Sequence, residues 1–220
     1  MSSRDDILGR VRAGLHRNAT NAAAGREVML AALSSRSHGP KPAVSADPKA
    51  LLERFQAKSE LQSSTVDIVA QESSVPAAIA RYLASMNLSK SAVAWPSLTV
   101  LDWSAAGLVV EGRGARDADL VGITGSFCAV AETGTLMVCS SPDTPATVSL
   151  LPETHIAIVH ASRIVPYMED AWDLARKELG TLPRAVNFIS GPSRTGDIEQ
   201  TIVLGAHGPY RVHLVIVENQ

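Results

Sequence analysis

The sequence predicts an α/β protein whose mostly parallel sheet is flanked by helices and preceded by an N-terminal helical arm. From residue 47 onward, short runs rich in Val, Ile and Ala alternate with segments whose apolar residues recur at helical spacing. This alternation is typical of a parallel sheet, whereas closely spaced strands, as around residues 132–135, favour a local antiparallel hairpin. A chain of 220 residues with 45 % hydrophobic content can bury one good core.

The N-terminal residues are predicted to form a helical arm. Ile7, Val11 and Leu15 recur at intervals of four residues, which predicts a helix, and apolar residues continue the pattern up to Leu33. Residues 34–42 are rich in Ser, Gly and Pro and indicate a linker. We therefore expect an arm with its linker at residues 1–46, able to pack on a partner or neighbouring subunit, and an α/β domain at residues 47–220.

The domain begins with a predicted helix at residues 48–60, which Asp47 caps and in which Leu51, Leu52 and Phe55 form the inner stripe. Apolar residues at helical spacing predict two further helices, at 75–87 and 165–179. Runs of β-branched and apolar residues predict strands at 65–70, 92–95, 100–103, 107–111, 120–124, 129–131, 135–140, 155–160, 185–189 and 211–217.

Charge and cysteine content exclude several classes of protein. A net charge of −2 lacks the clustered basic face that nucleic acid or an anionic membrane would require. No apolar run approaches the ~20 residues of a membrane-spanning helix, and we expect a cytoplasmic protein. Cys128 and Cys139 are the only cysteines, so this chain alone cannot build a four-thiolate iron–sulfur cluster. Their apolar neighbours favour reduced, partly buried thiols.

Polar groups crowd into residues 191–199 and 204–209, which suggests a binding surface. Arg194 offers a planar, permanently charged fork, and the hydroxyls of Ser193 and Thr195 flank it, a set that suits a carboxylate or phosphate. The alternative is an internal ion pair of Arg194 with the acid at 197 or 199. A helix that started near residue 195 would place both acids in its first turn, where the helix dipole alone favours them.

Glu132 is the other candidate for chemistry. It follows an apolar segment and precedes the Thr133-Gly134-Thr135 turn, and the roles open to it are base, nucleophile and turn carboxylate that caps its own backbone. His207 lies among turn formers and suits anion binding or proton transfer better than metal binding.

Other histidines and the common motifs offer less. His155 and His213 lie on predicted strands, where a structural role suits them. The sequence holds no GxxxxGK loop, GxSxG elbow, HExxH helix or paired CxxC, and the glycines of residues 112–116 predict only a loop.

Several motifs in a fixed order resemble the LUD-domain family, in its lactate utilization protein C branch. They are Gly122-Ile-Thr-Gly, Ala131-Glu-Thr-Gly-Thr, Ser149-Leu-Leu-Pro-Glu-Thr-His-Ile, Ile164-Val-Pro, Ile189-Ser-Gly-Pro-Ser-Arg-Thr-Gly-Asp-Ile-Glu and Leu204-Gly-Ala-His-Gly-Pro. The resemblance covers about residues 47–218, and Gly196 stands where the family pattern leads us to expect Ala.

The resemblance implies a NagB/RpiA/CoA-transferase-like fold and a part in oxidising L-lactate to pyruvate. It implies that this chain carries no cofactor or metal, that partner proteins hold the iron–sulfur clusters, and that this chain binds a small carboxylate or phosphate or serves as an assembly subunit. Transferred by motif, Glu132 and His207 become the catalytic candidates. The substrate-binding candidates are Thr133, Gly134, Thr135, Ser193, Arg194 and Thr195.

Two alternatives stay open at this point, and so does the question whether the chain is an enzyme by itself. One is a stand-alone CoA or acyl-transfer or sugar-phosphate enzyme that uses Glu132, the position where CoA-transferase relatives place a nucleophilic glutamate. The other is a regulatory scaffold with a vestigial pocket.

Overall fold

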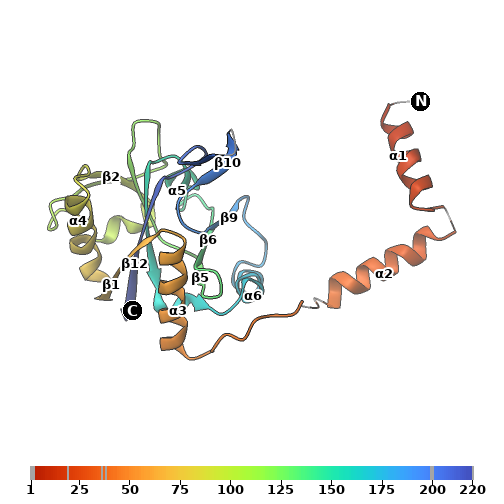
Figure 1. Ribbon diagram of the computed structural model, residues 1–220, viewed down its shortest axis with the longest axis horizontal. Helices are drawn as coiled ribbons and strands as arrows, with labels where there is room; N and C mark the ends of the chain where they lie inside the picture. The colour runs from red at the N-terminus through yellow and green to blue at the C-terminus, as the bar shows by residue number, and fades with distance from the viewer. Residues whose placement is uncertain (1–2, 19, 36, 38, 199–200, 220) are drawn as a thin grey trace. The chain divides into compact units, whose positions relative to one another are not determined.

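The computed structural model describes residues 3–18, 20–35, 37, 39–198 and 201–219 (Figure 1). By their internal contacts, the residues fall into two compact units, Met1–Pro42 and Ala43–Gln220. None of the helices within the described ranges is long and apolar enough to cross a membrane.

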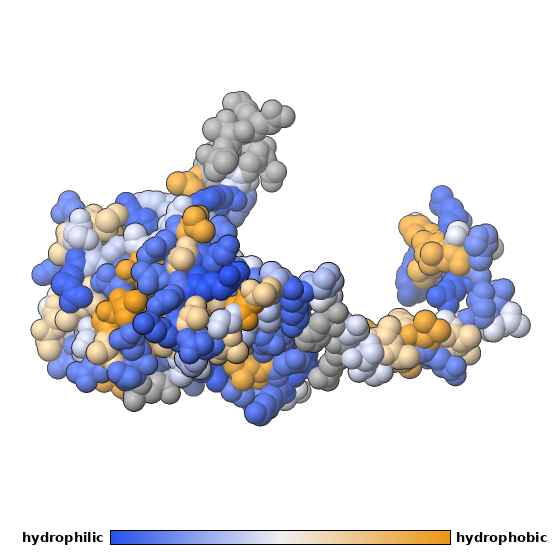
Figure 2. Space-filling view, turned by 60° about the horizontal axis from the view of Figure 1, so that its bottom comes forward, coloured by the Kyte–Doolittle hydropathy of each residue, from blue (hydrophilic) through white to orange (hydrophobic). Residues whose placement is uncertain are grey.

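The first unit consists of the helices α1 (Ser3–Gly14) and α2 (Ala22–Ser35), as the spacing of its apolar residues predicts. Neither helix buries a residue. Ile7, Val11 and Leu15 are each more than half exposed, and Figure 2 shows apolar surface on this unit. The arm is therefore helical, with its apolar faces uncovered in the single chain.

The second unit is built on a six-stranded sheet in which every neighbouring pair is parallel. In spatial order its strands are β1 (Thr65–Gln71), β12 (Arg211–Asn219), β7 (Thr154–His160), β4 (Val121–Thr124), β2 (Ser91–Ala94) and β3 (Val109–Gly112). Six consecutive residues of β7 and all four of β4 are buried, as expected for strands covered on both faces. The mostly parallel α/β fold is confirmed.

A second, four-stranded sheet lies beside the first and contains the predicted hairpin. Its strands, in spatial order, are β8 (Ile164–Val165), β5 (Cys128–Val130), β6 (Thr135–Cys139) and β9 (Val186–Ile189). The antiparallel pair β5–β6 closes through residues 131–134. A separate hairpin joins β10 (Arg194–Ile198) to β11 (Thr201–Leu204).

Helices cover both faces of the parallel sheet. They are α3 (Pro48–Leu61), α4 (Val75–Ser85) and α5 (Thr147–Leu150), whereas α6 (Met168–Leu179) packs on the four-stranded sheet. Short 3-10 segments lie at Glu72–Ser74, Pro96–Val100 and Ala161–Arg163. Asp47 starts α3 as predicted, since its Oδ2 accepts the Ala50 amide at 2.9 Å. Figure 1 shows α3 and α4 on opposite sides of the sheet. Phe55 of α3 and Ile79 of α4 accordingly belong to separate buried cores.

One sequence-based expectation about local structure is wrong. Residues 100–103 form no strand, because Pro96 opens a 3-10 turn and the Trp103 ring nitrogen donates to the Leu98 carbonyl at 2.9 Å, which folds the segment on itself. The helix near Thr195 that would have placed the acids at 197 and 199 in its first turn does not form, since Arg194 and Thr195 pair with Leu204 and Val203 in an antiparallel hairpin.

Two histidines lie in the core of the sheet, in the structural role predicted for them. The Nε2 atom of His155 is 2.8 Å from the Thr124 hydroxyl, and Nδ1 of His213 is 2.8 Å from the Thr65 hydroxyl. His213 also stacks on Tyr82 with ring centroids 3.8 Å apart. Burial lowers the pKa of each histidine to about 4, so both are neutral at pH 7.

Two glycines bring the second sheet against the C-terminal end of α3. Gly134, in the β5–β6 turn, has φ +68°, and a Cβ there would lie 2.5 Å from the Ser59 amide nitrogen. Gly191, which follows β9, has φ +75°, and a Cβ there would lie 2.1 Å from the Gln62 carbonyl oxygen. Both turns therefore require glycine for its conformation and for its lack of a side chain.

Gly134→Ala is expected to destabilise the protein far more than Gly107→Ala. Both residues have nearly the same φ, but a Cβ at Gly107 would meet nothing within 4 Å. The control Gly107→Ala therefore lowers the free energy of unfolding only by the backbone strain, about 1 kcal/mol. At Gly134 the clash lowers it by roughly 2 kcal/mol more. Urea unfolding of the two variants measures the difference, and equal losses would show that the turn does not depend on this contact.

The buried histidines predict that stability falls as the pH drops from about 6.5 to 4. In this window the unfolded chain binds protons that the folded histidines do not, which costs about 1.4 kcal/mol per pH unit for each histidine. Urea unfolding at pH 7.5 and 5 measures this loss. The double variant His155→Gln, His213→Gln should show a shallower pH dependence, and an unchanged slope would contradict the assignment.

Candidate functional site

The predicted hairpin turn and the segment after β9 lie side by side. The Thr133 and Thr135 hydroxyl oxygens are 2.7 Å apart, and the Thr135 hydroxyl is in turn 2.7 Å from that of Ser190. Thr135 begins β6 and Ser190 follows β9, so the antiparallel pairing of these two strands brings the hydroxyls together. The result is a chain of three hydrogen-bonded hydroxyl groups across two bends.

Arg194 lies at the end of α3. Its Nη2 atom donates to the Gln62 carbonyl at 3.3 Å and to the Ser63 hydroxyl. Carbonyls at a helix C-terminus lack intrahelical partners, so Arg194 helps to cap α3. Its side chain is exposed, and no carboxylate among the described side chains pairs with it. The alternative partners, Asp197 and Glu199, lie outside the side chains that the structure describes.

The turn that carries His207 adjoins Ser193. The Ser193 amide donates to the Pro209 carbonyl at 2.8 Å, and the Gly205 amide donates to the Ser193 carbonyl at 2.9 Å. His207 itself is exposed in this turn, between β11 and β12. Backbone hydrogen bonds thus place His207 in the turn that packs on the Arg194 segment.

Glu132 is half-buried in the β5–β6 turn. Its amide donates to the Pro166 carbonyl at 3.0 Å, while its carboxylate accepts no hydrogen bond from any described residue. A turn carboxylate that caps its own backbone is therefore not what the structure contains. No hydrogen bond or ion pair joins Glu132 to Arg194 or His207 in the described part of the chain, so a shared catalytic centre remains a prediction.

The sequence analysis missed the residues that hold these bends in place. Ser190 completes the hydroxyl chain, and Gln62 and Ser63 receive the Arg194 guanidinium. The glycine at position 191, between Ser190 and Pro192, was the available signal, because glycine is the default residue where the backbone closely approaches another segment, and the structure gives it φ +75°. Thr195, by contrast, is only 8 % exposed on β10 and contributes little surface.

The bends lie at the amino-terminal edge of the parallel sheet. Ser63 comes just before β1, and Pro209 comes just before β12. Open α/β sheets place most ligand sites at the opposite edge, outside the carboxyl ends of their strands. The predicted site is therefore at an unusual edge for this architecture.

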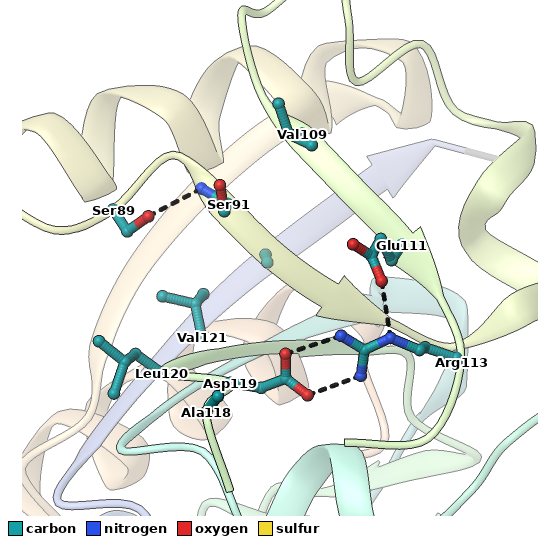
Figure 3. A pocket seen from close by; sticks show the side chains of 10 residues that line it. Ser89, Ser91, Val109, Glu111, Arg113, Ala118, Asp119, Leu120 and Val121 are labelled. Carbon is teal, nitrogen blue, oxygen red and sulfur yellow. Dashed lines mark hydrogen bonds and ion pairs between the residues drawn. The ribbon is translucent and has the colours of Figure 1, made fainter. Parts of the chain in front are cut away.

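A small hollow of about 150 Å³ beside β2, β3 and β4 is lined by Arg113, which is paired with two carboxylates (Figure 3). Arg113 donates to the two carboxylate oxygens of Asp119 at 2.6 and 2.9 Å and to Glu111 at 2.7 Å. The hydrogen bonds from Arg113 hold the pKa of the Asp119 carboxyl below its usual range. The two acids already neutralise this guanidinium, so the hollow does not suit an anion.

The described residues contain no group of three His, Cys, Asp or Glu side chains able to hold a metal ion. Cys128 and Cys139 are free thiols, the first buried and the second half-buried, as the sequence predicts. Burial raises the pKa of Cys128 to about 12, which keeps it protonated.

Comparison with known proteins gives three kinds of match. The LUD domain model matches residues 51–217. Lactate utilization protein C of Bacillus subtilis (strain 168) is 41 % identical over 131 residues, 57 % of this chain and 54 % of that protein. Lactate utilization protein C of Exiguobacterium sp. (strain ATCC BAA-1283 / AT1b) is 38 % identical over 143 residues, 64 % of this chain and 62 % of that protein.

The fold has a solved counterpart. The crystal structure of a DUF162 family protein from Deinococcus radiodurans superposes with a TM-score of 0.61 at 22 % identity, covering 79 % of this chain and 99 % of that one. The alignments span about half the length of the curated relatives. Because the family model matches most of the α/β unit from its first helix to its last strand, the chain belongs to the LUD domain family.

Proposed function

We propose that this chain takes part in lactate utilization in the cytoplasm, as a component that binds a small carboxylate while partner proteins carry the iron–sulfur chemistry. The names of its relatives support the pathway, since several proteins 35–41 % identical are called lactate utilization protein C. The cysteine content supports the division of labour, because two separate thiols cannot ligate a cluster that needs four.

The observation that carries the ligand proposal is that an exposed guanidinium and a chain of hydroxyls both adjoin the C-terminal end of α3, Arg194 through Gln62 and Ser63 and the hydroxyl chain through the neighbouring glycines Gly134 and Gly191. Arg194 binds a carboxylate through charge-assisted hydrogen bonds, which are stronger than neutral ones. The exposed hydroxyls of Thr133 and Ser190, which the buried Thr135 hydroxyl holds in place, donate and accept, as the 2-hydroxyl group of lactate requires. Together they match a 2-hydroxy acid better than a simple carboxylate.

In this proposal the remaining candidates have supporting parts. His207, in the adjoining turn, supplies a hydrogen bond or a proton, and Glu132 offers an acceptor whose lone pairs no described residue uses. The main role of Gly134 is to bring the turn against α3.

Arg194→Ala is expected to weaken L-lactate binding by tenfold or more, because one charge-assisted interaction contributes about 1.5–3 kcal/mol. Isothermal titration of the purified chain with L-lactate and pyruvate measures this. Arg176→Ala is the matched control, since it removes another exposed arginine, whose ion pair with Asp173 lies within α6. Thermal melting checks that loss of the α3 cap has not unfolded the variant. No heat of binding in the unaltered chain, or equal affinity in Arg194→Ala, would refute the carboxylate site.

Cells that grow on L-lactate are expected to lose this growth when the gene is deleted, and the tagged chain is expected to co-purify with iron–sulfur proteins. Complementation with Arg194→Ala separates binding from assembly. Restored growth would indicate a scaffold whose pocket is not needed. Growth that is unaffected by the deletion would contradict the lactate assignment itself, and a covalent acyl adduct on Glu132 would support acyl transfer instead.

A further inference from the structure

A second hollow, of about 400 Å³, lies at the carboxyl ends of two neighbouring parallel strands. Trp95 directly follows β2, Ser126 and Phe127 come shortly after β4, and all three line it. Within this sheet, the next strand along the chain after β2 is the edge strand β3, whereas the next after β4 is β7, on the other side. Such a reversal of direction is the position where open α/β sheets bind ligands.

This hollow is separate from the bends around Arg194. Its lining includes Cys139, the last residue of β6, whereas the hydroxyl chain begins at Thr135, the first residue of that strand. No lining residue is shared. We propose that the hollow binds an uncharged planar ring with a lactam edge, that is, a carbonyl next to a ring N–H, as in hypoxanthine or uracil.

The lining favours an uncharged ligand, because none of its side chains is ionised. It consists of aromatic, aliphatic, hydroxyl and thiol groups. Burial raises the pKa of the Cys139 thiol, so it is protonated at neutral pH. A charged ligand would lose its hydration here without gaining a counter-charge, which is costly.

Aromatic side chains give the hollow walls suited to a flat ring. The Trp95 ring is held by its indole nitrogen, which donates to the Pro145 carbonyl at 3.3 Å. Arg163 lies 4.9 Å from the Phe127 ring centroid and donates to the Phe127 carbonyl at 3.0 Å. Glu178 pairs with Arg163 at 2.7 Å, so this arginine orients Phe127 without leaving a free charge. The walls are thus fixed before a ligand arrives.

The hydroxyls offer a donor close to acceptors. The Ser140 hydroxyl accepts the Ala185 amide at 2.9 Å and keeps its own hydrogen to donate. The Thr144 hydroxyl donates to the Cys139 carbonyl at 2.8 Å, and the Ser126 hydroxyl donates to the Ile158 carbonyl at 3.3 Å, so both keep lone pairs. The carbonyl of a lactam accepts a hydrogen bond from the Ser140 hydroxyl, and the neighbouring ring N–H donates to the hydroxyl of Ser126 or Thr144.

The test compares inosine with purine riboside, which has the same size but lacks the carbonyl and the N–H. Titration calorimetry on the full chain is expected to show binding of inosine and at least tenfold weaker binding of purine riboside, since two hydrogen bonds are lost and their protein partners stay unpaired. Ser140→Ala should reduce inosine affinity five- to tenfold and leave purine riboside unchanged. Ser104→Ala, which does not line the hollow, should change neither.

A second measurement needs no variant. Inosine should slow the alkylation of Cys139 by iodoacetamide in the native chain, followed by mass spectrometry, because the ring covers this half-buried thiol. Equal affinity for the two nucleosides would overturn the lactam assignment. Absence of both binding and protection at millimolar inosine would overturn the site, whatever the outcome of the lactate titrations.

Discussion

The contact between two glycine turns and the C-terminal end of α3 is the constraint on which the arrangement of the molecule depends. Gly134 and Gly191 adjoin neighbouring strands at the same end of the four-stranded sheet, and both lie against the backbone at the C-terminal end of this one helix. A side chain at either position would push the four-stranded sheet away from the helix. The hydroxyls of Thr135 and Ser190, and the reach of Arg194 to Ser63, all require this close approach.

Local signals in the sequence predicted most of the fold. Asp47 followed by Pro48 marks the start of α3, and the structure has the expected hydrogen bond from Asp47 to the Ala50 amide. Continuous apolar runs predicted β7 and β12, since strands buried on both faces need no polar alternation. The errors arose where a tertiary partner decides. The segment at 100–103 has strand-like residues, but Pro96 and the Trp103 side chain fold it into turns.

The candidate site was predictable in its residue types and not in its contacts. Hydroxyls around a planar cation at Arg194 are visible in the sequence, but the guanidinium meets Ser63, 131 residues away, and only folding reveals this partner. The hollow beside Trp95 was missed for a related reason. Its position follows from the spatial order of β2, β4 and β7, and periodicity along the chain contains no information about that order.

β12 lies between β1 and β7, so the first strand of the sheet to be made has the last as its neighbour. A ribosome makes β1 about 140 residues before it makes β12. Before β12 is made, the edges of β1 and β7 that will pair with it have no hydrogen-bonding partner, and strands with open edges are prone to pair with other chains. The nascent protein therefore cannot close its main sheet until β12 has left the exit tunnel, so the strands made earlier are exposed to aggregation for as long as the segment between β1 and β12 is being synthesised.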